Sequence, residues 1–489
     1  MEDPRTTPDA GPDSTVPAAG ADGGADAAAG PGTGTGTDHG HGHGHDTGVL
    51  TVDAPAGALT GRVRDGVLRI HTIPYATAAP FGPASPAAPG PHDGREPIGD
   101  VIGDGSGTPL RDGVGHMQLT VTAPIAGVAG ERNRNGAGAR PILLWIHGGR
   151  FEEGHPSEPW CGARHFAEQG IVTVSLGYRK KLDGFWRRPD EGRAPYRAVD
   201  DLLIALRWVR DNAAAFGADA ANVTLSGQSA GAGLALALAS DARAEGLVHR
   251  VIALSPGLSR GSGGALRRLL VRLAGFPASG DVTREVAAKA YRAIASVAPT
   301  DTAVGPRIRE IRARVPLVVT VTSEEFHFAP PLIKADQLPG ARALARVIGA
   351  AHGGVGPLPP EAGDRPIGGV ISDAAIRASA VAVADSSAAA GMPTWVGEFR
   401  PGAGTGIGPD GRVTEGAPHC VDLPRFFGRE EGHPFHGEMV SFIRNGDPGW
   451  PRYRAPERIG RIWSGGGAEA VETEEPDPWG GVRAMFRRR

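Results

Sequence analysis

Two stretches of the chain carry the pattern Gly-x-Ser-x-Gly, which in many hydrolases places a nucleophilic serine on a sharp turn between a strand and a helix. They are residues 227–231, around Ser229, and residues 257–261, around Ser259. Because 75 of the 489 residues are glycine, the pattern alone is weak evidence. The chemistry in question is nucleophilic attack by an activated serine, which also needs a base, an acid that orients the base, and donors for an oxyanion.

The surrounding sequence favours Ser229 over Ser259. The run NVTLS (222–226) is typical of a strand and leads directly into Gly227, and the helical run GAGLALALAS begins two residues after Ser229. Gly227 and Gly231 would remove the side chains that clash in so tight a turn. Ser259 is separated from its strand by the residues SPG, and no helix is predicted to start at it. We therefore expect Ser229 to be the nucleophile.

The acid and the base should follow the serine in that order along the chain. Glu324 and Glu325 end the strand-like run VPLVVTVTSEE. Neighbouring residues at a strand end point to opposite faces, so only one of them can face the base, and both remain candidates. His419 lies in a loop between the runs PTWVGEF and CVDLPRFFG, a placement that lets a base reach across the sheet edge. The other histidines after the serine are His327, His352, His433 and His436.

A glycine-rich turn after an earlier strand is the expected source of oxyanion donors. The run LLWIH (143–147) is typical of a buried strand and is followed by GGRFEEG. We expect the backbone N–H groups of Gly149, Arg150 and Ala230 to converge there, each contributing on the order of 3 kcal/mol of transition-state stabilisation. If the Arg150 side chain faced the pocket, it would favour substrates that carry a carboxylate.

Continuous apolar runs alternate with helical patterns along the middle of the chain. Strand-like runs occupy 143–147, 171–178 and 222–226, and residues 196–217 repeat apolar side chains at helical spacing. This alternation predicts an α/β fold with a mostly parallel central sheet and helices on both faces, whose carboxyl-end loops would carry the reactive groups. We expect the Arg- and Ala-rich segment 258–312 to form a helical insertion over that edge.

The composition excludes several classes of function. The net charge is only −3, with 51 basic and 54 acidic residues, so no overall field favours nucleic acid or an anionic membrane. Two cysteines, Cys161 and Cys420, cannot build a disulfide framework, and free thiols are expected. No secretory signal and no apolar run of membrane-spanning length is recognised, which predicts a cytoplasmic protein.

The two ends of the chain differ from the middle. Residues 1–48 have few large apolar side chains and are predicted to be disordered, and residues 466–489 are predicted to form a loosely ordered tail. The catalytic domain would then span 49–465. Alternate histidines in the first segment could bind a transition metal only weakly, so no functional metal site is expected at His39, His41, His43 and His45.

Several blocks, in order, resemble the carboxylesterase type B family of α/β-hydrolases over about residues 59–463. They include LTGRVRDGVLRIHTIPYA, ILLWIHGGRFEEG, DDLLIALRWVRDNAAAFGADAANVTLSGQSAG, VTSEEFHF and APHCVDLPRFFG. The resemblance implies the α/β-hydrolase fold, with a triad of Ser229, Glu325 and His419. It also implies an oxyanion hole built from the backbone of Gly149, Arg150 and Ala230.

The chain departs from the family pattern at three places. Arg150 stands where the family usually has glycine or alanine, and Gln228 stands where cholinesterases carry glutamate, which makes a cationic substrate unlikely. The residues SPG (255–257) replace the family's QSG, so a supporting hydroxyl near the acid is expected to be lost or displaced.

These observations predict a serine hydrolase that cleaves small-molecule carboxylic esters through an acyl-enzyme, without a cofactor. The same groups could hydrolyse a lactone or an amide, or transfer an acyl group, and the sequence does not separate these reactions. A non-catalytic binding protein of the same superfamily is the other alternative. The presence of a suitable residue at all three triad positions argues against it.

Overall fold

The computed structural model describes residues 46–97, 116–126, 128, 139–158, 162–188, 196–259, 264–296, 304–327, 329–359, 363–402, 406–407, 413–414 and 416–486. The predicted disordered segment 1–48, with its histidines, lies outside the described residues up to position 45. The last residues of that segment, from Asp46, already belong to the first strand. Cys161 also lies outside the described residues.

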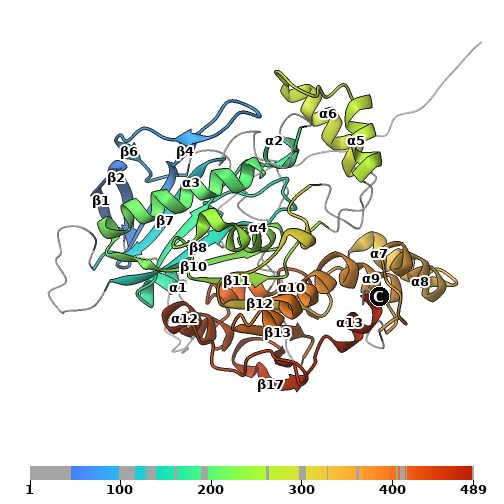
Figure 1. Cartoon of the computed structure of the whole chain (residues 1–489). Helices are drawn as coiled ribbons and strands as arrows, with labels where there is room; N and C mark the ends of the chain where they lie inside the picture. Colours follow the sequence, from blue (N-terminus) through green and yellow to red (C-terminus); the bar gives the residue numbers. More distant parts are fainter. Residues whose placement is uncertain are drawn as a thin grey trace, which may run out of the picture. The chain divides into compact units, whose positions relative to one another are not determined.

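A mixed sheet forms the centre of the fold (Figure 1). Its order is β1-β2-β3-β7-β9-β8-β10-β11-β12-β13-β16-β17, with β6 paired to β2, and the consecutive pairs from β9 to β16 are parallel. The strands are β1 (Asp46–Ala54), β2 (Gly57–Arg64), β3 (Val67–Pro74), β6 (His92–Asp93), β7 (Gln118–Pro124), β8 (Arg140–Ile146), β9 (Val172–Leu176), β10 (Ala218–Gln228), β11 (Arg250–Leu254), β12 (Leu317–Thr322), β13 (Thr394–Arg400), β16 (Ile459–Ser464) and β17 (Val471–Pro476). The predicted α/β class with a mostly parallel sheet is confirmed.

Helices surround this sheet. They are α1 (Arg164–Glu168), α2 (Lys181–Phe185), α3 (Arg197–Asn212), α4 (Ala230–Ser240), α5 (Gly264–Leu273), α6 (Arg284–Ala295), α7 (Pro330–Asp336), α8 (Ala341–Ala351), α9 (Pro366–Ser372), α10 (Ala378–Ala389), α11 (Asp422–Phe426), α12 (Phe435–Asn445) and α13 (Gly480–Phe486). The predicted helix at 196–217 is α3 followed by a 3-10 turn. Gly217 ends the turn with a φ of 64°, a left-handed conformation that glycine adopts without steric cost.

Both faces of the parallel strands are buried, and β8 shows how. Because side chains alternate along a strand, Leu144 and its alternate neighbours join the core that α3 and α4 cover, whereas Leu143 and Trp145 join a second core. In that second core the ring of Phe426 stacks on Trp145, and the ring of Phe166 packs against Phe426. A strand buried on both sides must be apolar throughout, which explains the continuous run in the sequence.

The segment expected to be a helical insertion does contain helices. In Figure 1, α5 and α6 lie together near α2, and α6 contacts α2. Gly305, which follows α6, approaches the ring of Phe151 so closely that a β-carbon there would lie 2.5 Å from a ring atom. The insertion therefore packs beside the turn that follows β8.

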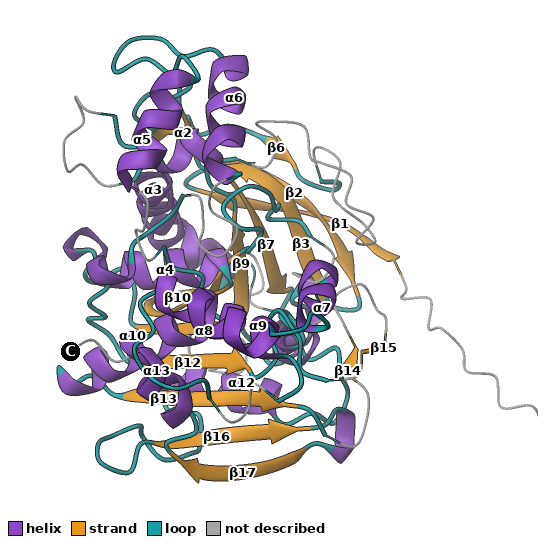
Figure 2. Ribbon diagram, turned by 90° about the vertical axis from the view of Figure 1, so that its right-hand side faces the viewer, coloured by secondary structure: helices purple, strands orange, loops and turns teal. Residues whose placement is uncertain are grey.

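The expectation of a loosely ordered C-terminal tail is wrong for residues 466–486. The strand β17 pairs along its whole length with β16 and forms one edge of the sheet (Figure 2). Beyond it, the side chains of Trp479 and Met485 are 1% and 2% exposed. The run VETEEP appeared tail-like because an edge strand keeps its polar side chains. Glu475 forms an ion pair with Arg400 on β13 at 2.8 Å.

One helical segment is more apolar than the sequence analysis recognised. Residues 366–389 form a continuous helix that is long and apolar enough to cross a membrane, but 89% of its most apolar window is buried within the protein. Arg377, in its middle, forms a buried ion pair with Glu398 of β13 at 3.1 Å. A helix packed on all sides in a protein core has the same composition.

Substitution of Trp479 tests the revised view of the C-terminal segment. We expect Trp479→Ala to lower the free energy of unfolding by about 3–5 kcal/mol, because it leaves a cavity under α13. The matched control is Val471→Ala, since the Val471 side chain is 59% exposed, and its effect should stay within about 0.5 kcal/mol. Urea unfolding curves measure both. A loosely held tail would instead make the two variants equally mild.

Candidate active site

The backbone around Ser229 forms a strained turn between β10 and α4. Ser229 has φ 54° and ψ −119°, outside the conformations that side chains favour. An ideal β-carbon on Gly227 would lie 2.5 Å from the carbonyl carbon of Gly231. One on Gly231 would lie 2.0 Å from the carbonyl oxygen of Ile146, at the end of β8. Both glycines are therefore required for the approach of these backbones, and the turn presents the serine at the carboxyl end of the sheet.

The next strand holds this turn in place. The Ser229 N–H donates to the carbonyl of Leu254 at 2.9 Å, and the Gly257 N–H donates to the carbonyl of Ser229 at 2.8 Å. Gly257 is the first residue of the second Gly-x-Ser-x-Gly pattern. The second pattern therefore stabilises the turn that the first one forms. Ser259 is 3% exposed and its N–H donates to the carbonyl of Pro306. Because the next helix, α5, begins only at Gly264, Ser259 does not sit on a strand-to-helix turn.

The structure brings His419 and Glu325 together. Nδ1 of His419 donates to Oε2 of Glu325, and the two residues are also linked through the His419 N–H and the Glu325 carbonyl at 3.0 Å. The other carboxylate oxygen accepts from the Thr322 N–H at 2.9 Å. Burial alone would raise the pKa of Glu325, but His419 and the hydrogen bonds to the carboxylate outweigh burial and lower it below its ordinary value.

A serine hydroxyl supports this carboxylate, contrary to expectation. Ser255 Oγ donates to Oε1 of Glu325 at 2.7 Å, so the supporting group is not lost. Ser255 directly follows β11 with a φ of 44°, and its N–H donates to the carbonyl of Thr320 on β12 at 2.8 Å. This pairing with the adjacent strand fixes a left-handed conformation that directs the hydroxyl toward Glu325. Sequence comparison with the family's QSG cannot reveal such a change in direction.

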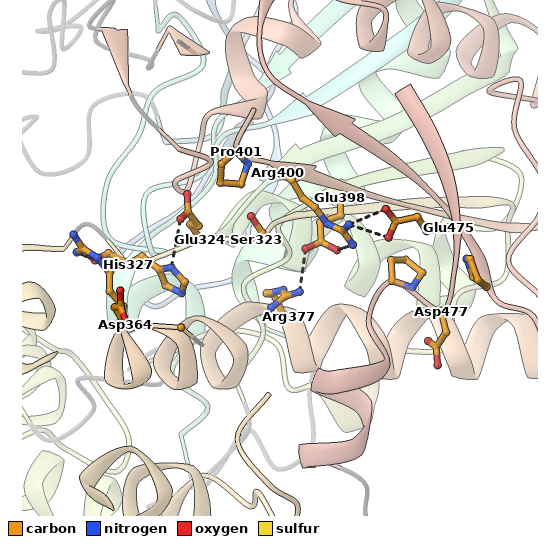
Figure 3. A pocket seen from close by; sticks show the side chains of 14 residues that line it. Ser323, Glu324, His327, Asp364, Arg377, Glu398, Arg400, Pro401, Glu475 and Asp477 are labelled. Carbon is orange, nitrogen blue, oxygen red and sulfur yellow. Dashed lines mark hydrogen bonds and ion pairs between the residues drawn. The ribbon is translucent and has the colours of Figure 1, made fainter. Parts of the chain in front are cut away.

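The neighbouring Glu324 faces a different environment. Its Oε2 accepts from the Ala417 N–H at 2.7 Å, and its Oε1 lies 3.9 Å from Nδ1 of His327. Glu324 lines a cavity of about 700 Å³, whose lining includes neither Glu325 nor His419 (Figure 3). The alternative in which Glu324 orients the base therefore has no geometric support.

Ion pairs form the far wall of that cavity (Figure 3). Glu398, which is fully buried, lies 3.1 Å from Arg377 and 3.4 Å from Arg400. Arg400 also pairs with Glu475 at 2.8 Å. Burial raises the pKa of Glu398, although both arginines oppose the shift. These charges bind one another, and within the described ranges no cluster of three or more metal-ligating side chains occurs.

Three backbone N–H groups near the serine are free within the described part of the chain, two in the turn after β8 and one on the residue that follows Ser229. Gly149, Arg150 and Phe151 have φ values of 94°, 57° and 67°, so successive residues take left-handed conformations. Among the described residues, the N–H groups of Gly149, Arg150 and Ala230 have no hydrogen-bond acceptor. An ideal β-carbon on the preceding residue, Gly148, would lie 3.4 Å from Cβ of Ser229, which shows how closely this turn approaches the serine.

The Arg150 side chain is largely exposed and lies next to an acidic side chain. It is 64% exposed, and its Nε lies 3.6 Å from the carboxylate of Glu152. Because Glu152 already lies next to this charge, a preference for substrates that carry a carboxylate stays a prediction.

The other described histidines make structural contacts. His433 Nδ1 accepts from the Phe435 N–H at 3.2 Å, and His436 Nδ1 donates to the Phe426 carbonyl at 2.8 Å. Burial lowers the pKa of His433 to about 3 and also lowers that of His436. His352 is the C-cap residue that follows α8. Only His419 among these residues reaches Glu325.

Two further residues lie near the His419 ring, and no role beside the histidine was predicted for either of them. Nε2 of Gln228 lies 3.1 Å from Nε2 of His419, and no direct hydrogen bond joins the described side chains of Ser229 and His419. Asp422 is fully buried without hydrogen-bond partners for its carboxylate oxygens. Burial and the nearby Glu325 raise its pKa to about 7. Only its position, three residues after His419 at the start of α11, could have pointed to Asp422 in the sequence.

The charge state of His419 reflects competing influences. Burial disfavours the charged ring, whereas Cys420 and Glu325 favour it, and the pKa of His419 is raised well above its ordinary value of 6.5. Cys420 is a free thiol next to the ring. The ring of Phe326 packs on His419 with centroids 5.1 Å apart. A carboxylate that stabilises the imidazolium formed when the neutral ring takes a proton is the arrangement expected beside a general base.

Comparisons with known proteins agree with this geometry. The model of the carboxylesterase family matches residues 117–269. A probable N-octanoylanthranilate hydrolase of Rhodococcus erythropolis is 30% identical over 84% of this chain and 97% of its own length. A phenmedipham hydrolase of Pseudarthrobacter oxydans is 27% identical over 86% of this chain and 97% of its own length.

The fold also has close counterparts among solved structures. Carboxylesterase EST55 of Geobacillus stearothermophilus is 26% identical and superposes with a TM-score of 0.69 over 89% of this chain and all of that chain. The match covers at least 97% of the length of each of these three proteins. This chain also has a strand-turn-helix at the serine and a mostly parallel sheet. Together these findings lead to one conclusion. This chain belongs to the carboxylesterase family, and it is an α/β-hydrolase that cleaves carboxylic esters.

Proposed function

We propose that Ser229, His419 and Glu325 form the catalytic triad and that the N–H groups of Gly149, Arg150 and Ala230 form the oxyanion hole. The observation that carries this proposal is the His419–Glu325 hydrogen bond, which the contact of His419 with Gln228 places next to the strained turn at Ser229. The unpaired N–H groups next to the serine support the second part, because an oxyanion supplies the acceptor that they lack.

The reaction follows from these positions. His419 Nε2 takes the proton of the Ser229 hydroxyl while Oγ attacks the ester carbon, and the three N–H groups stabilise the negative oxygen that forms. Glu325 holds the ring through Nδ1 and stabilises its charged form. Collapse of the intermediate breaks the ester bond, and the proton on Nε2 passes to the departing alcohol. Water, activated by the same nitrogen, then releases the acid from the serine.

A second candidate reaction is hydrolysis of an N-acyl bond. One relative that this chain covers almost completely is named for N-octanoylanthranilate. The same groups suffice for an amide, provided that His419 protonates the leaving nitrogen. Turnover of N-octanoylanthranilate at a rate comparable to that of p-nitrophenyl octanoate would favour this candidate. Turnover of the ester alone would restrict the enzyme to esters.

Removal of the nucleophile or the base tests the triad most directly. We expect Ser229→Ala and His419→Ala each to reduce kcat for a short-chain p-nitrophenyl ester by at least about 10⁴-fold, since acylation then loses its nucleophile or its base. Release of p-nitrophenol measures the rate, and circular dichroism verifies the fold. Substantial turnover by the Ser229 variant would refute the proposed nucleophile.

The choice between the two adjacent carboxylates can be tested with a matched pair of variants. We expect Glu325→Gln to reduce kcat by about 10³–10⁴-fold, because an amide cannot stabilise the charged imidazole. Glu324→Gln keeps an oxygen that can accept from the Ala417 N–H and should reduce kcat less than about tenfold. Steady-state kinetics on both variants decide the matter. Equal losses would show that the two carboxylates do not differ in role.

The buried Glu325 charge also predicts how stability depends on pH. The pKa of Glu325 is lowered by folding, so its stabilising contribution is complete above the ordinary value of 4.5 and is lost as the pH falls through the lowered value. Ser255→Ala removes one hydrogen bond to this charge and should cost about 1.5–3 kcal/mol at neutral pH. The difference from the wild type should shrink as the pH falls below 4.5.

Ser226→Ala is the control for this measurement. The Ser226 hydroxyl is buried and donates to the neutral carbonyl of Leu144 at 3.0 Å, so its loss should cost the same at every pH. Urea unfolding over a pH series measures both variants. A Ser255→Ala effect that is independent of pH would show that the hydroxyl does not stabilise the ionised form of Glu325.

A further inference from the structure

The side-chain amide of Gln228 contacts Nε2 of His419, the nitrogen that would accept the serine proton. Gln228 ends β10, immediately before Ser229, and is 3% exposed. Its Nε2 lies 3.1 Å from Nε2 of His419 and 3.2 Å from Sγ of Cys420. Its Oε1 lies against the turn after β8, where an ideal β-carbon on Gly148 would be 2.9 Å away. The amide thus fills the space between the histidine and the oxyanion donors.

The donor and acceptor roles at this contact follow for the neutral His419 ring, the form in which it can act as a base. Nδ1 of His419 donates to Glu325, so in the neutral ring Nε2 is the acceptor. An amide nitrogen can only donate, and it carries two hydrogens. One hydrogen is directed at His419 and the other at Cys420. A ring nitrogen has one lone pair, so it cannot accept from the amide and from the Ser229 hydroxyl at the same time.

We propose that Gln228 is a positioning residue that holds His419 Nε2 in a resting arrangement and must release it before Ser229 can be activated. This inference rests on the proposed triad. The hydroxyl of Ser229 has no hydrogen bond to His419 in the structure, as the competition requires. An entering ester needs the space that the amide fills, because its leaving oxygen must approach the same nitrogen. Release of Gln228 is therefore linked to occupation of the pocket.

Removal of the amide should make the serine more reactive in the free enzyme. The probe is a small alkyl fluorophosphonate, which reacts with the activated serine hydroxyl, displaces fluoride and makes no demand on ester specificity. Each neutral hydrogen bond that no longer has to be broken corresponds to about a fivefold change, so loss of both should accelerate phosphonylation about five- to thirtyfold.

Two variants separate the hydrogen bond from the space it occupies. Gln228→Ala removes the amide and opens a gap, whereas Gln228→Met removes the amide but keeps a side chain of similar length. We expect both variants to be phosphonylated faster than the wild type and by a similar factor. Acceleration in the alanine variant alone would mean that the pocket is merely enlarged, and this result would overturn the proposal. An unchanged or slower rate in both variants would overturn it too.

The acid limb of the pH profile of kcat/KM is a second measurement. It would not shift if Gln228 had only a structural role. The charged or titratable groups around the His419 ring are Glu325, Cys420 and Asp422, and all three remain in the variants. The amide donates to the neutral ring and so opposes its protonation, and its removal in Gln228→Met should shift the limb to higher pH. An unmoved limb would show that the amide does not bind Nε2 in solution.

The same experiment separates this inference from the proposed function. If the wild type is not phosphonylated, or if Ser229→Ala is still labelled, the proposed triad is wrong. If the wild type is labelled at Ser229 but the two Gln228 variants react no faster, the triad stands and only the role of Gln228 is wrong. Intact mass spectrometry and peptide mapping identify the labelled residue in each case.

Discussion

The buried charge of Glu325 is the constraint on which the active site depends. A carboxylate without access to water is costly unless hydrogen bonds satisfy it, and this one receives them from three segments of the chain. Thr322 ends β12, Ser255 directly follows β11, and His419 lies in the loop before α11. None of these three segments can move without leaving the charge unsatisfied. The carboxylate therefore fixes the position of the histidine relative to the sheet.

The second constraint is the close approach of backbones at the carboxyl ends of β8 and β10. Gly231 lies so near the Ile146 carbonyl that no side chain fits there, and this contact places the serine beside the turn with the free N–H groups. The parallel sheet makes the arrangement available, since it brings these strand ends to one edge. The turn at Ser229 follows β10 and the charge at Glu325 follows β12, so they lie on the two sides of β11, and Gln228 connects the turn to the histidine that Glu325 holds.

Patterns that depend on neighbouring residues were predictable from the sequence, and features that depend on distant contacts were not. The strand-turn-helix at Ser229, the apolar runs of the parallel strands and the end of the helical segment at Gly217 all follow from local spacing and from glycine. The direction of the Ser255 hydroxyl depends on pairing with Thr320, 65 positions away by the numbering of the chain. The contact between Gln228 and His419 joins residues 191 positions apart. Burial of Trp479 in the core was hidden in the sequence by the polar residues of the edge strand that precedes it.

That edge strand also affects how copies of the protein can meet. An exposed strand edge offers unpaired backbone groups to any other chain. On β17 the side chains of Glu472 and Glu474 are exposed at this edge. Pro476 has no N–H group, which removes one donor at the end of the strand. A second molecule could extend the sheet at this edge only by bringing its own carboxylates against these and by stripping water from both sets. The edge that completes the fold therefore also opposes aggregation through it.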